Sequence, residues 1–495
     1  FHKTIKKTWN RVALLIPKLN KDQFKEVYDK GLDATFALFD ALQNAVETLE
    51  KRVSHLEAIL AKDSHNSSKP PSSNGFKRPP QSLRGKSGKK AGGQKGHNGT
   101  TMRQVENPDY TRIHRRQGSC SCGRCLDTAR VIGITKRQVF DLPEIKVKTT
   151  EHQAQTIMCE CGKIHTADFP DGINAPVQYG SGLKALTTYF IVQQLLPVQR
   201  TQQIFQDLFG IDLSPATLQS YTKICYDGLE TTEKITLDKI IEGPVAHADE
   251  TGCDVNQKLW WIHSLSNLMY TWYFCEKHRG KNATTVAAEI SRFGGRLVHD
   301  GWKSYLHYVC KHALCNAHHL RELIFIDEHL KEPWALKMKK HLLEIKEAVQ
   351  IAWNNGENQL PDDILQKFRK RYLLIIRQGY AMQPPPKIRR SGQRGKIAQS
   401  PGKNLLDRLS KHIDEVLAFM YDFTVPFTNN LAERDLRMVK VKLKVSGCFR
   451  THFGAQIFCR IRGYLSTIRK QGLNIMDYLV KCFNPYSNFM NLLPE

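Results

Sequence analysis

The stretch VAHADETGCD, residues 245–254, ends a short apolar run in two adjacent acids, Asp249 and Glu250. A third acid, Asp254, closes the stretch, in a chain whose formal net charge is +25. The run predicts a strand, and successive side chains of a strand point to opposite faces. Asp249 and Glu250 therefore cannot both face one site, and the alternation by itself does not choose between them.

The residues that follow predict a sheet around this strand. PVAHADETGCDV, LWWIHSLS and MYTWYFCE predict three successive strands with turns at residues 256–258 and near Asn267. NATTVAAEISRFG predicts a helix, GGRLVHDG a fourth strand ending in Asp300, and HALCNAHHLREL a short fifth strand running into a helix. This order is typical of a ribonuclease H-like fold. There the first strand is central, and an acid near its midpoint meets an acid at the end of the fourth strand.

A third acid is expected from a helix that crosses the sheet. FTNNLAERDLRMVKVKLKVSGCFRT, residues 427–451, predicts this helix, with Asn429 or Asn430 as its cap and Glu433 in its first turn. The alternative is an amphipathic surface helix with one ordinary acid. The basic residues of the segment form a stripe that could hold phosphates. They are Arg434, Arg437, Lys440 and Lys444.

Three carboxylates from separate elements suit phosphoryl transfer on a phosphodiester. The reaction needs an activated oxygen nucleophile and a stabilised leaving oxygen, which two divalent cations about 3.5–4 Å apart provide. Magnesium, or manganese in its place, prefers carboxylate oxygens together with water and phosphate. The basic chain around the acids would attract the polyanion.

The composition is typical of a multidomain protein that binds a polyanion, with nucleic acid as the leading candidate. At 495 residues the chain is long for one hydrophobic core. No apolar run approaches the ~20 residues of a membrane-spanning helix, so no membrane partner is expected. No secretory signal is visible, which favours the cytosol. The 13 cysteines are therefore expected to be thiols or metal ligands rather than disulfides.

Residues 22–62 predict one long helix whose apolar positions recur alternately three and four residues apart. They are Phe39, Leu42, Val46, Leu49, Val53, Leu56 and Leu60. This seam favours a dimeric coiled coil over a helix packed on its own domain, because its register is unbroken. The next segment, residues 62–99, is rich in Pro, Gly, Ser, Lys and Arg. It predicts a flexible linker, either a basic arm that follows phosphates or a solvated tether.

A cysteine cluster lies within residues 118–165, in GSCSCGRC and CECGKIH. The pair Cys122 and Cys125 can converge with the pair Cys159 and Cys161 on one tetrahedral structural zinc. The alternating residues between the pairs predict a β-hairpin, as in a zinc ribbon. Cys120 is a spare that could replace Cys122. The alternative is a set of unrelated buried thiols.

Two further regions predict helices. In residues 180–242, QRTQQIFQDLFG is followed by PATLQSYTKICYDGL, with Ser214 as cap and Pro215 at the first helical position. The two helices predict either a helix-turn-helix or an ordinary helical hairpin. Residues 323–425 predict a helical insertion between the second and third acids. Its helices are HLLEIKEAVQIAW, ILQKFRKRYLLIIRQGY and NLLDRLSKHIDEVLAFMYDF, and its basic loop is PPPKIRRSGQRGKIAQSPGK.

The segment CNAHHLREL contains Cys315, His318 and His319. Cys315 and His318 are three positions apart on a helix start and can share a face. A fourth metal ligand is not evident in the sequence. We therefore favour a structural or DNA-contacting role over a second zinc.

In order, the motifs are the heptad helix, NSSKPPSSNG, GGQKGHNG, the cysteine cluster, HADETG, HDGWKSY, CNAHHLREL and NNLAERDLRMVKVKLKVSGCFRT. This set resembles the insertion sequence 66 family of transposases from about residue 30 onwards. The resemblance implies a ribonuclease H-like catalytic domain with an Asp-Asp-Glu triad. The triad falls on Asp249 in HADETG, Asp300 in HDGWKSY and Glu433 in NNLAERD. The resemblance, not the periodicity, selects Asp249 over Glu250.

The expected fold is therefore multidomain α+β. The expected parts are an N-terminal coiled-coil segment (1–62), a basic linker (63–110), a zinc-ribbon-like domain (111–172), a helical, possible DNA-binding region (173–242), the first part of a ribonuclease H-like core (243–322), a helical insertion (323–425), and completion of the core by the Glu433 helix and C-terminal helices (426–495).

The resemblance implies a DNA transposase that uses two magnesium or manganese ions. It would cleave the ends of its element and transfer the 3′ hydroxyl into target DNA. Its expected partners are double-stranded DNA, a second copy or more of the chain, and helper proteins from the same element, in the bacterial cytoplasm at the nucleoid. The alternatives are an Asp-Asp-Glu endonuclease without strand transfer and a non-catalytic DNA-binding repressor.

Overall fold

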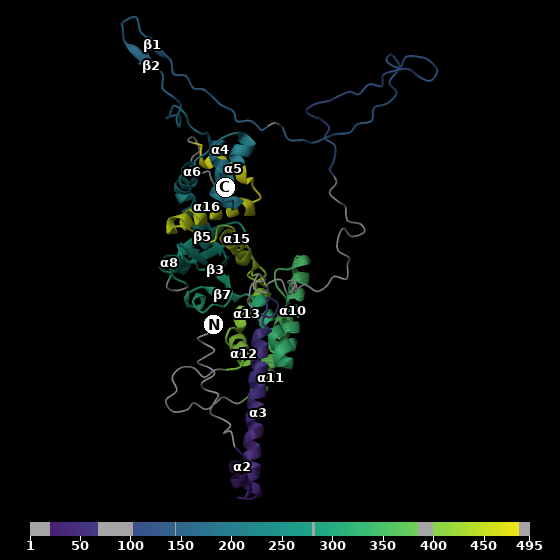
Figure 1. Cartoon of the computed structure of the whole chain (residues 1–495), viewed down its shortest axis with the longest axis vertical. Coiled ribbons are helices and arrows are strands. Elements are labelled where there is room, and N and C mark those ends of the chain that lie inside the picture. Colours follow the sequence, from purple (N-terminus) through teal and green to yellow (C-terminus); the bar gives the residue numbers. More distant parts are fainter. Residues whose placement is uncertain (1–19, 68–101, 144, 280–282, 385–398, 485–495) are drawn as a thin grey trace. The chain divides into compact units, whose positions relative to one another are not determined.

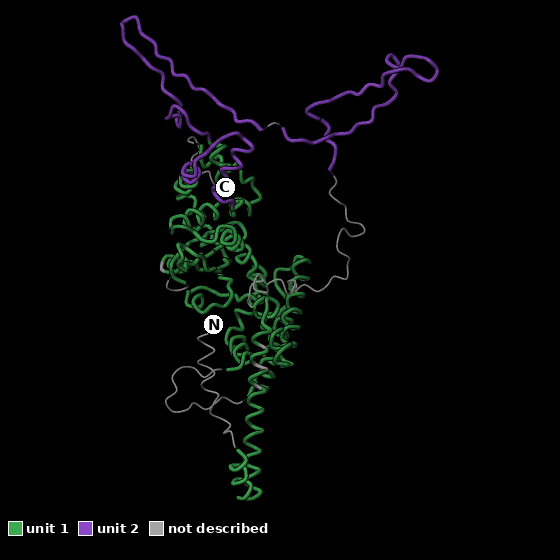
Figure 2. Tube along the Cα trace, viewed as in Figure 1, with its two compact units in different colours: residues 1–83, 181–195, 221–495 green, residues 84–180, 196–220 purple. Residues whose placement is uncertain are grey.

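The computed structural model describes residues 20–67, 102–143, 145–279, 283–384 and 399–484. The chain forms two compact units (Figure 2). The first unit comprises residues 1–83, 181–195 and 221–495, and the second comprises residues 84–180 and 196–220. Helices and a central sheet make the fold mixed α+β, as the sequence predicts.

A five-stranded sheet forms the centre of the first unit (Figure 1). Its strands are β3 (Val245–Val255), β4 (Lys258–Ser266), β5 (Thr271–Glu276), β6 (Arg296–His299) and β7 (Lys311–Leu314). They lie in the order β5-β4-β3-β6-β7, antiparallel from β3 to β5 and parallel from β3 to β7. The central position of β3 confirms the prediction, and β6 ends one residue before Asp300.

The hairpin between β3 and β4 gives Asp254 a local role. Asn256 and Gln257 have φ angles of 50° and 61°, the left-handed pair that a two-residue hairpin turn requires. Asp254 Oδ1 accepts a hydrogen bond from the backbone N–H of Gln257 at 2.8 Å. Asp254 therefore stabilises the turn beyond the site region.

Helices cover both faces of the sheet. On one face, α7 (Glu230–Ile241) and α8 (Thr284–Ser291) share an apolar core with Ala246 and Ala248 of β3. On the other, α15 (Asn430–Ser446) and α16 (His452–Lys470) share a core with Cys253 and Val255. The short helices α4 (Ser181–Thr188), η2 (Tyr189–Gln193) and α17 (Ile475–Cys482) complete this second core.

The strand alternation now separates the two neighbouring acids. The pairing of β3 with β4 is continuous from His247 to Val255, so the alternation is not interrupted by a bulge. Asp249 has the parity of Cys253 and Val255, and Glu250 has that of the two alanines. Asp249 therefore faces the side covered by α15 and α16.

The insertion is helical, but its last predicted helix is broken. α9 (Asn316–Phe325) follows β7 and mostly precedes the predicted insertion. The elements of the insertion are η5 (Ile326–Leu330), α10 (Pro333–Asn354), α11 (Asp362–Ala381), α12 (Pro401–Lys411), α13 (Ile413–Val416) and α14 (Ala418–Tyr421). The sequence predicts one helix over residues 404–423, whereas the backbone leaves helical geometry at His412 and Leu417. Near this break the side chain of Asn316 donates to the Val416 carbonyl at 3.0 Å. The predicted basic loop lies mostly at residues 385–398, outside the described residues.

The N-terminal helix is also divided. The structure has α2 (Lys21–Tyr28) and α3 (Leu32–Leu60) in place of one helix over residues 22–62. Gly31 has a φ of 100°, which lies outside helical geometry and ends the continuity. The seam of α3 from Phe39 to Leu60 is exposed within the described chain. The predicted linker lies mostly at residues 68–101, outside the described residues.

The second unit contains little regular structure. A two-stranded hairpin pairs β1 (Thr156–Met158) with β2 (Ile164–Thr166). The longer strands expected between the cysteine pairs are not seen in the described residues, where the apolar side chains are largely exposed. The helix α5 (Val198–Phe209) ends at Gly210. Ser214 Oγ caps α6 (Pro215–Gly228) by accepting from the N–H of Thr217 at 3.1 Å, as predicted, and residues 215–220 of α6 belong to this unit.

None of the described helices combines the length and the apolar character that crossing a membrane would take.

Candidate active site

Asp249 and Asp300 come from neighbouring parallel strands. Asp249 lies within β3, and Asp300 follows the last residue of β6. The register pairs Val245 with Arg296 and His247 with Val298. Continued by two residues, this register sets Asp249 beside Asp300. The two acids predicted from separate motifs therefore meet at one edge of the strand pair.

Glu433 arrives from α15, whose start is fixed to β3 by Asn429. The buried Asn429 side chain donates to the Ala248 carbonyl at 2.9 Å, and its Oδ1 lies 2.8 Å from His247 Nδ1. The backbone N–H of Asn429 also donates to Cys315 Sγ at 3.1 Å. Asn429 occupies the cap position as predicted, but its side chain binds the strand instead of the helix N–H groups. It thereby positions the first turn of α15 on the Asp249 face.

The pKa of Asp249 agrees with the placement of Asp300 and Glu433 near it. Burial, the negative charges of Asp300 and Glu250, and that of Glu433 raise the pKa of Asp249 to about 8. A hydrogen bond from the Glu250 backbone N–H at 2.9 Å acts in the opposite direction. The charged groups that act most strongly on Asp249 are all carboxylates.

Glu250 has different partners. Its carboxylate accepts a hydrogen bond from Arg279 Nε at 2.7 Å and another from the Tyr305 hydroxyl, and the side chain is only 2% exposed. The Arg279 guanidinium lies 3.9 Å from the ring centre of Trp302 and 4.6 Å from that of Trp261. The charge of Glu250 is thus neutralised by a fixed cation, whereas that of Asp249 is not.

The donor set of Asp249, Asp300 and Glu433 fits divalent cations. All three supply hard carboxylate oxygens, the ligands that magnesium and manganese take. Burial and then repulsion among the acids raise the pKa of Asp249, and a cation would offset the repulsion. These three residues would hold the cations.

His318 lies beside Glu433, and the sequence did not connect this histidine with the acids. Ligand atoms of Cys315, His318 and Glu433 lie within 4.8 Å of one another, and no other such group of three occurs among the described residues. His318 Nε2 is 3.9 Å from Glu433 Oε1. The sequence offered Cys315 and His318 as a pair without further ligands, because Glu433 is far away along the chain.

The predicted basic stripe lies on the outer side of α15. Arg434, Arg437, Lys440 and Lys444 are exposed, while Ala432, Leu436 and Val439 of the same helix are buried. Among the described residues, no ion pair is formed by any of the four. Their charges therefore face solvent along α15, from the residue after Glu433 to the last turn.

The predicted zinc ligands are exposed thiols at two turns of the second unit. Within the described residues, Cys122, Cys125, Cys159 and Cys161 do not gather into a group with ligand atoms close together. Each pair lies in a local turn instead.

The two cysteine turns have the same backbone. Cys120 N–H donates to the Arg124 carbonyl and Cys159 N–H to the Lys163 carbonyl, each at 2.8 Å. Gly123 and Gly162 both have a φ of 84°. In each turn, hydrogen bonding by the second cysteine (Cys122 or Cys161), its backbone N–H first, lowers the pKa of the first thiol (Cys120 or Cys159). By this geometry Cys120, rather than Cys125, is the counterpart of Cys159.

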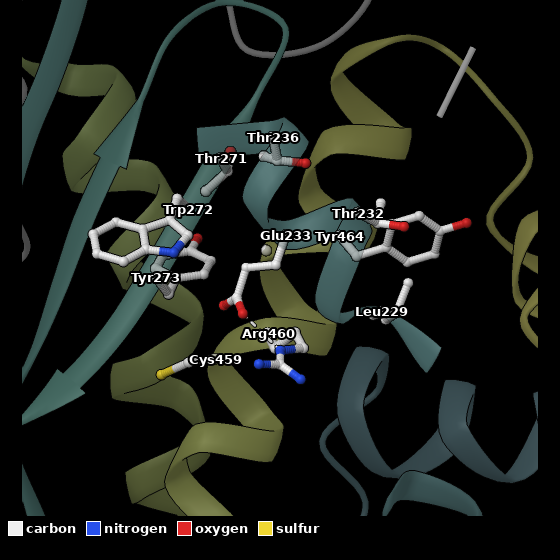
Figure 3. A pocket seen from close by; sticks show the side chains of 11 residues that line it. Leu229, Thr232, Glu233, Thr236, Thr271, Trp272, Tyr273, Cys459, Arg460 and Tyr464 are labelled. Atoms are coloured by element: carbon white, nitrogen blue, oxygen red, sulfur yellow. Dashed lines mark hydrogen bonds and ion pairs between the residues drawn. The ribbon is translucent and has the colours of Figure 1, made fainter. Parts of the chain in front are cut away.

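A pocket elsewhere in the first unit has a structural character. It is lined by residues of α7, β5 and α16 and includes none of the three acids. Figure 3 shows Glu233 and Arg460 pointing toward each other there, and Arg460 Nε lies 2.6 Å from Glu233 Oε2. Arg460 also lies 3.7 Å from the ring centre of Tyr226. The pocket therefore lies where α7 packs against α16, and the ion pair stabilises that contact.

Comparison with known families gives a match for the part of the chain that contains the sheet. Residues 176–457 match the profile of the family described as Transposase IS66 family. The chain belongs to the IS66 family of transposases. The matched span includes all three acids, His318 and the basic stripe of this transposase, but not the cysteine turns. Residues 10–103 match a family of unknown function (DUF6444). The comparison with curated proteins gives no match.

Proposed function

We propose that this transposase cleaves DNA at the ends of its element and joins the freed 3′ hydroxyl to target DNA. The first unit would be a ribonuclease H-like catalytic core in which Asp249, Asp300 and Glu433 hold two divalent cations, magnesium or manganese. The observation that carries the proposal is the register of β3 and β6, which sets Asp249 beside Asp300, and the raised pKa of Asp249, to which burial, Asp300 and Glu433 contribute, agrees with it. The family membership and the order of the sheet strands support it.

In the first step, a water oxygen attacks the phosphorus at the element end, and the 3′ oxygen leaves to become a hydroxyl. In the second step, that hydroxyl oxygen attacks a target phosphorus and displaces its 3′ oxygen. The cations, when bound, activate the attacking oxygen and stabilise the leaving one. Asn429 contributes by fixing the start of α15 to β3, so that Glu433 stays on the Asp249 face.

DNA is the expected partner of a transposase, and the charge distribution supports this. The net charge of +25 favours association with a polyanion. Arg434, Arg437, Lys440 and Lys444 would contact phosphates near the acids without reading sequence. Recognition of the terminal repeats would fall to the second unit, including the helices on either side of Gly210. An Arg437→Ala variant with unchanged salt dependence of DNA binding would contradict the stripe.

We further propose a structural zinc in the second unit, bound by Cys122, Cys159, Cys161 and one more cysteine. The spacing in the sequence favours Cys125 as the fourth ligand, and the matching turns favour Cys120. We also propose that α3 pairs with a second copy through its exposed seam. A Leu49→Glu variant with the same mass in light scattering as the parent would contradict that pairing. Helper proteins from the same element and a cytoplasmic location at the nucleoid complete the proposal.

Metal-dependent cleavage of labelled end DNA by an Asp249→Asn variant tests the proposal. We expect cleavage to be lost, because the substitution removes a cation ligand, while DNA binding in a gel-shift assay stays close to that of the parent. Asp254→Asn is the matched control, since the amide oxygen can still accept the turn hydrogen bond and cleavage should persist.

Retained cleavage in Asp249→Asn would overturn the assignment of the acid. Nicked products without joined products would indicate an endonuclease without strand transfer. DNA binding by the parent protein without cleavage in either magnesium or manganese would indicate a repressor.

A further inference from the structure

The two adjacent histidines of CNAHHLREL have different surroundings. The buried His319 has its Nδ1 3.1 Å from Asn316 Oδ1. In contrast, the buried Nδ1 of His318 has no hydrogen-bond partner within the described chain. Its Nε2 lies 3.9 Å from Glu433 Oε1, which is too long for a hydrogen bond. Of these two histidines, His318 is therefore the one whose ring nitrogens make no hydrogen bond within the described chain.

The neighbouring thiol is already occupied. Cys315 is 1% exposed, and its Sγ accepts the backbone N–H of Asn429 at 3.1 Å. That bond ties α9 to the start of α15. Cys315 thus has a structural role, and His318 is the member of the three-residue group that remains available to a ligand.

The position of the ring matches a shared cation. Two ligand atoms about 2.1 Å from one ion are at most about 4.2 Å apart, and the measured separation of His318 Nε2 and Glu433 Oε1 is within that limit. Burial and the positive charge of Arg321 lower the pKa of His318, and the charges of Glu433 and Asp300 act in the opposite direction. Two of the three acids are therefore near the ring.

We propose that His318 is a nitrogen ligand of the cation held by Glu433, and that it makes this site prefer Mn²⁺ to Mg²⁺. The inference rests on the proposed function, because it needs the carboxylates to bind a cation. Magnesium keeps to oxygen ligands, whereas imidazole nitrogen suits first-row transition ions. One nitrogen among the oxygen ligands thus shifts the metal preference without removing the site.

The test measures metal binding by the full-length protein, prepared without a histidine tag and in the absence of DNA. Electron paramagnetic resonance counts free and bound Mn²⁺, and competition with Mg²⁺ gives the relative affinity. Electron spin-echo modulation detects a ¹⁴N nucleus bound to Mn²⁺. The variants are His318→Ala, His318→Gln and Glu433→Gln, with His307→Ala as control because His307 is exposed.

We expect ¹⁴N modulation in the parent and in His307→Ala, and none in His318→Ala. The affinity of His318→Ala for Mn²⁺ should fall about tenfold or more, with a smaller change for Mg²⁺. His318→Gln offers an oxygen in place of the nitrogen. It should bind Mg²⁺ and Mn²⁺ with a smaller preference than the parent, which also shows that the site has folded.

Each contrary outcome has its own meaning. Persistent ¹⁴N modulation in His318→Ala, or an unchanged preference for Mn²⁺, with loss of binding in Glu433→Gln would overturn the role of His318 and leave the carboxylate site intact. Unchanged Mn²⁺ binding in Glu433→Gln would overturn the carboxylate site itself. Loss of DNA cleavage in His318→Ala with unaltered metal binding would assign His318 to the DNA instead and overturn the proposal.

Discussion

The three acids of the first unit and the cysteine turns of the second are candidate metal sites built in opposite ways. Asp249 lies in β3, Asp300 directly follows β6 and Glu433 lies in α15, so the folding of distant segments places them near enough to act on Asp249. Cys159 and Cys161 lie in a short exposed turn stabilised by its own backbone. In the first case the fold places the three carboxylates near enough for Asp300 and Glu433 to raise the pKa of Asp249, while their ligand atoms do not all lie within 4.8 Å of one another in the described residues. In the second, the metal would have to bring the two turns together.

This difference predicts opposite responses to metal removal. Zinc bound to a cysteine site contributes directly to the free energy of folding, typically about 10–16 kcal/mol. Removal of the zinc should therefore unfold the second unit. We expect one zinc per chain by elemental analysis. A strong chelator should increase proteolysis within residues 102–180 while leaving the thermal transition of the first unit unchanged. Protein purified without zinc would contradict the site.

The same measurement identifies the fourth cysteine. Cys120→Ser and Cys125→Ser are matched single-atom changes within one turn. Only one of them should lose zinc, and the matching turns predict that it is Cys120→Ser.

The carboxylate site predicts a pH effect on stability in the absence of divalent cations. The pKa of Asp249 is about 8 in the folded protein and about 3.9 in the unfolded chain. Between these two pKa values Asp249 is protonated in the folded state and ionised in the unfolded chain. The contribution of Asp249 to the free energy of unfolding is therefore fully present below pH 4 and is lost as the pH rises toward 8. The slope is about 1.4 kcal/mol per pH unit at most. Asp249→Asn should flatten it in denaturant titrations, as should added magnesium; a slope that persists in the variant contradicts the assignment.

The hydrogen bonds by which Asn429 connects α15 to β3 predict the smallest effect on stability. Asn429→Ala removes two buried hydrogen-bonding contacts and leaves the Ala248 carbonyl and His247 without that partner, a loss of about 1–3 kcal/mol in the free energy of unfolding. Because Glu433 depends on these hydrogen bonds, Mn²⁺ binding should weaken as well. Asn430→Ala is the control, since Asn430 is exposed and adjacent. Equal effects in both variants would show that Asn429 has no special role.

The strands, and the position of Asp300 at the end of one of them, followed readily from the sequence, for a physical reason. Each strand of the sheet is marked by its own apolar residues, and Asp300 stands at the end of such a run. The choice between Asp249 and Glu250 could not follow from the local pattern. It depends on which helices cover which face, and that is set by packing between segments far apart in the chain.

Other features escaped prediction for the same reason. Asn429 has the residue type of a helix cap, and only the folded chain reveals that its side chain binds β3. His318 lacked a third ligand in the sequence because Glu433 belongs to another element. The break at Gly31 was different, since a glycine is a local signal and the apolar seam begins only at Phe39.

The order of the acids along the chain has a consequence for protein synthesis. Asp249 and Asp300 leave the ribosome before α10 to α14, and Glu433 leaves after them. Domains form as their residues emerge, so a nascent chain carries two of the three acids while the insertion is still being translated. While the insertion is being translated, the nascent chain therefore holds Asp249 and Asp300 without Glu433.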